Sequence, residues 1–318
     1  MSSADTATSC RFSTRISLRW LPEPAHETTD TIVMSVNGWY LDLRIDLKTN
    51  DIDWAIAGQR VVESEEPLRV AFTHELDSHN AFESVDCGTF VTLPNGDDLE
   101  TGEMPRHDLP GAPVAEYEEV WRELPFRESP EGTKKGISWV LESDDGDLSE
   151  IEGEVTVRKI FLGRIWGTFL ALQQDLTHVR QRSPSGEWLV TKTGGVVSAR
   201  REEWSDGWME RYAVGRFGGS LPSMARGIQG MDSWETVGER IDIDGRPFIL
   251  RAFEEFSYAN PTNAAFLCYT RQGLRSLSSG FIARDPSQMR NSEESSKPNP
   301  LHLPLVEAGA GTAREGLV

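Results

Sequence analysis

Hydrophobic and polar residues alternate clearly over residues 31–47. Residues 31–36 are rich in β-formers, Asn37-Gly38 follows, and residues 39–47 then place Trp and aliphatic side chains at odd positions and mostly charged ones at even positions. A period of two predicts a strand with one buried face and one wet face. Asn-Gly supplies the two positive φ angles of a type I′ turn, so the pattern predicts a β-hairpin. Residues 53–58 are predicted to form the next strand.

The same short alternating segments recur as far as residue 253 and are separated by turn residues. Further strands are predicted at residues 15–20, 68–74, 88–93, 99–103, 137–141, 155–160, 163–174, 177–182, 187–191, 203–204, 208–214, 241–243 and 247–253. So many antiparallel strands predict an all-β protein, and closure into barrels would remove exposed sheet edges.

Prolines and glycines divide the chain near its middle. Residues 114–124 are predicted to form a short helix, and a polar linker with Pro130 and Gly132 follows. We therefore expect a disordered arm at 1–13, a barrel at 14–126, a linker at 127–135, a second barrel at 136–256 and a disordered tail at 257–318.

Several segments resemble a known family. NGWYLDLR at residues 37–44 and DWAIAG at 53–58 resemble a GxYxxLR…F.WAFAG pattern of the fungal Hri family. ETG at 100–102, EVWREL at 119–124, GRIWG at 163–167 and the hairpin of residues 203–208 with LP at 221–222 resemble later segments. The resemblance covers about residues 15–256.

The resemblance implies two tandem lipocalin-like antiparallel β-barrels with a short helix between them and disordered termini. It also implies a cytosolic location and no established enzymatic activity. By the same resemblance, the partners would be a kinase of the casein-kinase-I type and a component of the secretory translocation machinery.

The net charge of the chain argues against some classes of binding partner. The 318 residues carry 51 acids and 32 Lys and Arg, a formal net charge of −19. Such a surface repels phosphate backbones and anionic headgroups, which argues against nucleic-acid binding. The acid-rich stretches 51–103 and 142–154 are either solvated surfaces or a docking surface for a basic partner.

Location is inferred from what the chain lacks. It has no apolar run long enough to span a membrane and no signal-peptide pattern. Its three cysteines, Cys10, Cys87 and Cys268, are widely separated, which suits a reducing compartment. We therefore expect a cytoplasmic protein.

The chemical motifs are weak. His74 and His79 lie five residues apart, which puts them on opposite faces of a strand, so no metal site is expected. His107-Asp108 are adjacent, and neighbouring residues seldom hold a general-base geometry. We predict no cofactor and assign no catalytic residue.

Tryptophan suggests where a ligand could bind. Eight residues are candidates for lining a pocket: Trp39, Trp54, Glu100, Glu119, Trp139, Arg164, Trp166 and Trp188. The tryptophans would either plug the barrels or form an apolar cup, with the charged residues as polar anchors. Ser143 and Ser149 lie in an acidic segment, so they are phosphorylation candidates or simply part of a solvated loop.

The leading hypothesis is a non-catalytic cytosolic protein that acts through protein partners and a small hydrophobic ligand. The alternative is a cofactor-free cyclase or isomerase of fungal specialised-metabolite biosynthesis, because a lipocalin-like pocket can hold a substrate in a reactive conformation. A structural or storage role is the third option.

Overall fold

The computed structural model describes residues 9–257, apart from 85, 134, 149–150, 184, 186, 229–233 and 235. The described part is built from β-strands, and its one helical element is a short 3₁₀ turn, η1 (Gly218–Ser220). The strands form two antiparallel sheets within one compact unit. The all-β prediction is therefore confirmed.

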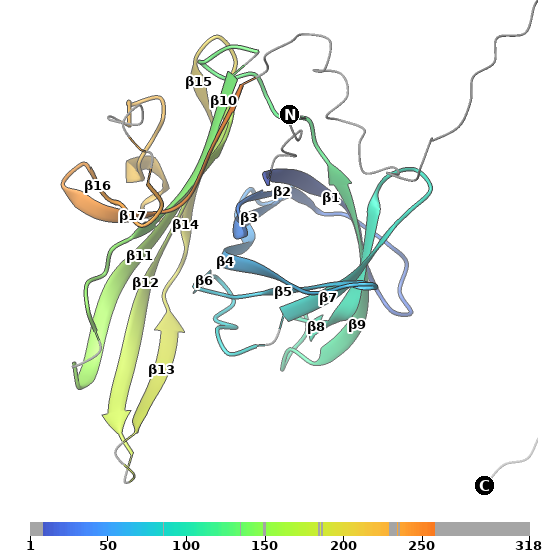
Figure 1. Cartoon of the computed structure of the whole chain (residues 1–318). Coiled ribbons are helices and arrows are strands. Elements are labelled where there is room, and N and C mark those ends of the chain that lie inside the picture. Colours follow the sequence, from blue (N-terminus) through green and yellow to red (C-terminus); the bar gives the residue numbers. More distant parts are fainter. Residues whose placement is uncertain are drawn as a thin grey trace, which may run out of the picture. The chain divides into compact units, whose positions relative to one another are not determined.

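The first sheet closes into a barrel, seen as a ring in Figure 1. Its strands are β1 (Arg11–Trp20), β2 (Thr29–Val36), β3 (Trp39–Asp46), β4 (Ile52–Glu65), β5 (Leu68–Phe72), β6 (Leu76–Asp77), β7 (Asp86–Thr92), β8 (Asp98–Pro105) and β9 (Val114–Glu123). The β1–β9 and β3–β4 pairings close a ring of eight strands, and short β6 adds to β4.

The predicted hairpin connects β2 to β3. Val36 pairs with Trp39, and Asn37 and Gly38 have φ angles of 47° and 83°. Both values lie in the left-handed region that a type I′ turn requires. The turn therefore fixes the register of the two strands.

Two predictions for the first half were wrong. Residues 114–124 were expected to be helical, but residues 114–123 form β9, which pairs with β1 and β8. Both faces of β9 carry acids, so its sequence does not alternate between hydrophobic and polar residues. The arm also ends earlier than residue 13, because Arg11 pairs with Ser35 of β2. Residues 1–8 lie outside the described residues.

The second sheet is open. It contains β10 (Lys135–Ser143), β11 (Gly153–Ile165), β12 (Thr168–Arg182), β13 (Trp188–Gly194), β14 (Ser198–Trp204), β15 (Trp208–Val214), β16 (Arg240–Ile243) and β17 (Arg246–Ser257). The strand order is β15-β14-β12-β11-β10-β17-β16, and β13 pairs with the C-terminal half of β12. Among the described residues β15 and β16 do not pair, so the second half differs from the expected closed barrel (Figure 1).

This sheet has no need to close, because both of its faces are covered. Val140, Phe161 and Leu170 join one core with residues of the barrel strands β2 and β3. The opposite face, which includes Trp139 and Phe169, packs against a segment that follows η1. Burial of apolar surface on both sides supplies the stabilisation that barrel closure would otherwise provide.

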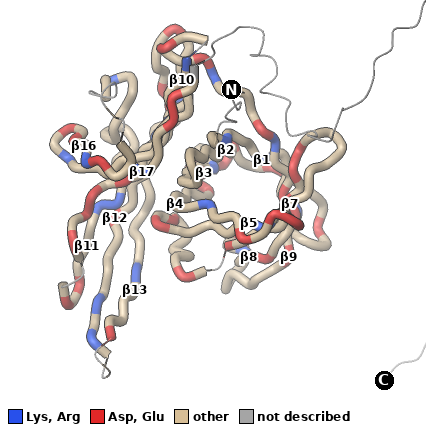
Figure 2. Tube along the Cα trace, in the orientation of Figure 1, with Lys and Arg blue, Asp and Glu red and all other residues tan. Residues whose placement is uncertain are grey.

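The two sheets share a core, so the division into domains at residues 126 and 136 stays a prediction. The predicted tail begins where β17 ends, and residues 258–318 lie outside the described part. Acidic and basic residues are both spread over the two sheets, and the β12–β13 hairpin carries several of the basic ones (Figure 2).

Candidate ligand site in the first barrel

The polar face of β3 points into the barrel. Tyr40, Asp42 and Arg44 line a cavity in the lumen, whereas Leu41 and Leu43 belong to the core shared with the second sheet. The sequence predicted the alternation correctly, but the odd positions were expected to face inward. The apolar face was assigned to the lumen because a sheet is normally buried on one side only, and here the second sheet buries the other side.

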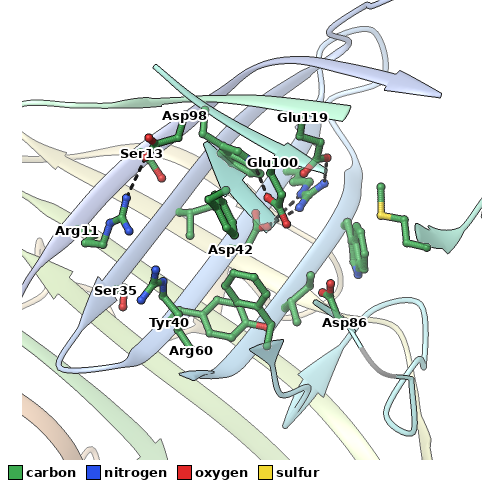
Figure 3. Close-up of a pocket in the computed structure, with 18 of the residues that line it drawn as sticks. Arg11, Ser13, Ser35, Tyr40, Asp42, Arg60, Asp86, Asp98, Glu100 and Glu119 are labelled. Carbon is green, nitrogen blue, oxygen red and sulfur yellow. Dashed lines mark hydrogen bonds and ion pairs between the residues drawn. The ribbon is translucent and has the colours of Figure 1, made fainter. Parts of the chain in front are cut away.

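The lumen is hollow, and charged side chains stand among aromatic and aliphatic ones on its wall (Figure 3). The cavity has a volume of about 90 Å³. Three arginines line it: Arg11, Arg44 and Arg60. Six acids also line it: Asp42, Asp86, Asp98, Glu100, Glu119 and Glu123. The cavity has room for a small ligand.

Arg44 links two of these carboxylates. Its Nε and Nη2 donate to Oδ2 of Asp42 at 3.0 and 2.8 Å, and its Nη1 donates to Oε1 of Glu119 at 3.1 Å. Arg15 donates to the same Glu119 oxygen at 2.6 Å. The Arg44 guanidinium also lies over the Trp54 ring, 4.7 Å from its centroid. Desolvation opposes its charge, but these carboxylates raise the pKa of Arg44 well above its usual value.

Glu100 has a different environment. It accepts hydrogen bonds from the Tyr117 hydroxyl at 2.9 Å and from Trp121 Nε1 at 2.8 Å, and no ion pair of the described residues includes it. Burial, together with the charges of Glu119 and Asp86, raises the pKa of Glu100 to about 8. A carboxyl group at this position keeps its proton near neutral pH unless a cation approaches.

Asp42 is only partly satisfied. Both donors of Arg44 go to Oδ2, and Oδ1 is buried without a hydrogen-bond partner among the described residues. Burial raises the pKa of Asp42, and the charge of Arg44 opposes that change. Asp42 is one of the residues that line the cavity (Figure 3).

The buried side chain of His74 contacts Asp86, which lines the cavity, and Asp77. His74 Nδ1 lies 3.0 Å from Asp77 Oδ2, and its Nε2 lies 3.1 Å from Asp86 Oδ2. Burial opposes its charge, but hydrogen bonds to the two acids raise the pKa of His74 to about 9. Asp77 also accepts a hydrogen bond from Trp54 Nε1 at 2.8 Å, which orients that ring on the cavity wall.

A second hollow lies next to the lumen and shares Arg44, Trp54 and Met104 with it. His79 and His107 line this hollow with ring centroids 4.1 Å apart, and His79 stacks on Trp54 at 4.9 Å. Burial and the neighbouring His107 lower the pKa of His79. The described residues contain no group of three or more His, Cys, Asp or Glu side chains suited to a metal ion.

Only part of the predicted site comes together. Trp54, Glu100 and Glu119 line the lumen. Trp39 lies on the outer face of β3, where it stacks on Phe161 at 6.3 Å.

The other candidates lie in the second sheet. Trp139 is fully buried beside Phe169 and Trp234. Arg164 is also fully buried and donates to Glu131 at 2.6 Å and to the carbonyl of Trp166. Trp166 occupies the β11–β12 turn with a φ angle of 51°.

Trp188 lies beside two arginines on the β12–β13 hairpin, with Arg180 and Arg182 at 4.9 and 4.1 Å from its ring. Ser143, a phosphorylation candidate, is buried at the end of β10, where its hydroxyl donates to Asp145 and accepts from the Ile160 amide. Ser149 lies outside the described residues.

Several residues that line the lumen were not predicted from the sequence: Tyr40, Asp42, Arg44, Tyr117 and Trp121. The even positions of residues 40–44 carried a signal, because Asp and Arg two residues apart share a strand face and can form an ion pair there. Tyr117, Glu119 and Trp121 also have the spacing of one strand face.

No helix of the described residues is long and apolar enough to cross a membrane. Of the cysteines, Cys10 is buried and Cys87 is partly buried.

Comparisons with known proteins bear on the family. No curated protein matches the chain. A crystal structure of the uncharacterized protein YLR301w from Saccharomyces cerevisiae is similar, with a TM-score of 0.54 and 15% identity over 77% of this chain and 99% of that chain. This likeness concerns the fold alone. The family model described as Protein HRI1 matches residues 11–246, well over half of the chain. The chain therefore belongs to the HRI1 family, as the motifs at residues 37–44 and 53–58 indicated.

Proposed function

We propose that this protein is a non-catalytic binding protein that holds one small ligand in the lumen of its first barrel. The observation that carries the proposal is a hollow barrel interior lined with buried charges. Removing ions from water costs several kcal/mol each, and apolar residues of similar volume often stabilise a core as well or better. Charged side chains around an internal cavity are therefore better explained by ligand recognition than by stability.

The lining favours an amphipathic ligand that carries a charged group over the purely hydrophobic one expected from tryptophan content. Trp54 contributes to the wall, but Trp39, Trp139, Trp166 and Trp188 lie elsewhere. Acids and arginines stand among aromatic and aliphatic side chains on the remaining wall.

Native mass spectrometry of full-length protein purified from its source tests this function. We expect a small molecule bound to the wild-type protein and lost on denaturation. Ser35→Tyr would fill the cavity from β2 and abolish the bound species, whereas Ser205→Tyr, in the exposed β14–β15 turn, would keep it. Wild-type protein without a bound molecule, or Ser35→Tyr protein that folds and retains it, would contradict the proposal.

A cofactor-free cyclase or isomerase is the second candidate, and Glu100 favours it. A carboxyl group with a pKa of about 8 carries a transferable proton at neutral pH, as a general acid must. Incubation of small-molecule extracts from the source with wild-type and Glu100→Gln protein tests this alternative. Conversion of a metabolite by the wild-type protein alone would favour an enzyme.

Protein partners in the cytosol complete the proposal. Leu189 and Val190 of β13 are exposed beside Trp188 and its flanking arginines, which gives the β12–β13 hairpin a basic and apolar surface on an acidic protein. A kinase of the casein-kinase-I type and the translocation machinery are the partners that we propose to test. Binding of either purified partner that Leu189→Ser weakens would support this role.

A further inference from the structure

We propose that the ligand of the first barrel is a small organic cation with N–H donors, such as a primary ammonium or a guanidinium compound, bound between Asp42 and Glu100. This inference rests on the proposed binding function and specifies the ligand class. Four features of the lumen support it: an unpaired acceptor, a carboxyl group without a cation, aromatic walls and an excess of acids.

The unpaired acceptor is Oδ1 of Asp42. Asp42 lines the cavity, and only 4% of its surface is exposed. Arg44 occupies Oδ2 with two hydrogen bonds, and Oδ1 has no donor among the described residues. A buried acceptor without a partner costs about 1–3 kcal/mol, and more when it is charged. A ligand N–H directed at Oδ1 would remove that cost.

Glu100 supplies the second anchor. Its hydrogen-bond donors, Tyr117 and Trp121, are neutral, and the charges of Glu119 and Asp86 oppose its ionisation. Arg44 interacts with Glu100 electrostatically but forms no ion pair with it among the described residues. Gly88 of β7 leaves the space that this carboxyl group occupies, since a Cβ there would lie 2.2 Å from Glu100 Oε1. A ligand cation would make ionisation of Glu100 favourable and would form the charge-assisted hydrogen bond that it lacks.

The aromatic walls also favour a cation. Tyr40 and Phe72 line the cavity with ring centroids 5.3 Å apart. The Arg44 guanidinium already lies over the rings of Trp54 and Trp121, at 4.7 and 5.6 Å. Aromatic faces attract cations through their quadrupole, most strongly where water is excluded. The remaining rings can hold the carbon portion of an organic cation close to the two acids.

The charge balance opposes an anion. Six acids and three arginines line the cavity. Arg11 pairs with Asp98 and Glu123, and Arg44 pairs with Asp42 and Glu119. An anion would have to compete with these carboxylates for the same guanidinium groups and would lie beside Asp42 Oδ1. A cation bound by Asp42 Oδ1 and Glu100 would leave these pairs of Arg11 and Arg44 in place.

Isothermal titration calorimetry of the full-length protein tests the ligand class with three probes that share a phenyl ring and a short chain and differ in charge. The probes are 2-phenylethylammonium, 2-phenylethanol and phenylacetate. We expect the ammonium ion to bind at least about tenfold more tightly than the alcohol, which corresponds to about 1.4 kcal/mol, and the carboxylate to bind more weakly still. Binding should also release protons near pH 7, which appears as a dependence of the measured heat on the ionisation enthalpy of the buffer.

Three variants locate the binding. Glu100→Gln and Asp42→Asn should each weaken ammonium binding about tenfold or more. Glu63→Gln, an exposed acid of β4 paired with Arg69, is the matched control and should bind as the wild type does. If Asp42→Asn fails to fold, Glu100→Gln decides the outcome alone, because the Gln oxygen can accept from Trp121 Nε1 while its NH2 group donates to the Tyr117 hydroxyl.

The outcomes separate the ligand class from the binding function. Tighter binding of the alcohol or the carboxylate, or no ammonium binding, would overturn the cation proposal. Ammonium binding that Glu100→Gln leaves unchanged would overturn it as well. The binding function itself would survive these results if native mass spectrometry still shows a molecule that Ser35→Tyr removes, and it would fall if the wild-type protein carries none.

Discussion

At the residue scale, Glu100 shows how burial without a cation changes a carboxyl group. The unfolded chain releases this proton near pH 4.5, whereas the folded barrel holds it until about pH 8. Between these values the folded state binds more protons, so the free energy of unfolding falls as pH rises. The same group that recognises a cation therefore destabilises the empty barrel toward alkaline pH.

Replacement of Glu100 by Gln should flatten this dependence. Between pH 5 and pH 8, wild-type protein should lose more stability than Glu100→Gln protein, because Gln cannot release a proton. Urea unfolding at unit steps of pH measures both slopes. Glu63→Gln is exposed and should follow the wild-type curve. Parallel curves for wild-type and Glu100→Gln protein would contradict the assigned environment of Glu100.

His74 has the opposite pH dependence. Its pKa rises from 6.5 to about 9 through hydrogen bonds to Asp77 and Asp86, so the stabilisation is fully present below pH 6.5 and is lost as pH rises through 9. His74→Gln should cost about 2 kcal/mol at pH 6, since it removes a charge from between two acids. The difference should shrink by pH 10. Urea unfolding at both pH values measures it, and exposed His26→Gln is the control.

At the element scale, β3 shows what sequence could and could not predict. Alternation correctly gave the strand, its turn and its partner β2, because these depend on local pattern and turn chemistry. The choice of inner face depends on what covers the outside of the barrel, and that cover comes from β11 and β12, more than a hundred residues away. Asp42 and Arg44 were missed for this reason.

The β9 strand shows a related failure. Tyr117, Glu119 and Trp121 face the lumen, while Glu118 and Arg122 lie on the other face. A strand with charged groups on both faces has no hydrophobic alternation, so the acids of residues 116–123 suggested a solvated helix. In both strands, charged residues that face the lumen changed the hydrophobic and polar pattern on which the prediction of strands and buried faces depends.

The two faces of β3 should respond differently to truncation. Leu41 is fully buried in the shared core, so Leu41→Ala should cost about 2–5 kcal/mol through lost burial and a residual cavity. Leu47, just after the strand, is 58% exposed, and Leu47→Ala should change stability by less than about 0.5 kcal/mol. Equilibrium unfolding in urea measures both. A small effect of Leu41→Ala would mean that the outer face of β3 is not covered by the second sheet.

At the scale of the whole described unit, the two sheets depend on each other. The apolar outer face of the barrel strands β2 and β3 is buried only against the second sheet, and Asp77 of the barrel is tied to Gln174 of β12 by two hydrogen bonds. Asp30 of β2 likewise pairs with Arg201 of β14 at 2.9 Å. A core shared in this way makes separate unfolding of either sheet costly.

Gly163 of β11 provides the sharpest test of this coupling. A Cβ there would lie 2.8 Å from Met34 Sδ and 3.0 Å from Leu41 Cδ1, both on the barrel. Gly163→Val should overpack the shared core and cost about 1–3 kcal/mol. Gly207→Val, in a turn with no atom near its Cβ, is the matched control and should leave the core unchanged.

Native-state hydrogen exchange then shows whether both sheets respond together. If they unfold as one cooperative unit, the slowest amides of β3 and β11 share one opening free energy, and Gly163→Val lowers both by the same amount. Calorimetry should show a single transition that shifts to lower temperature. Loss of protection in the second sheet alone, with β3 still protected, would mean that the barrel keeps its closed form without its cover. The lumen site would then be independent of the second sheet.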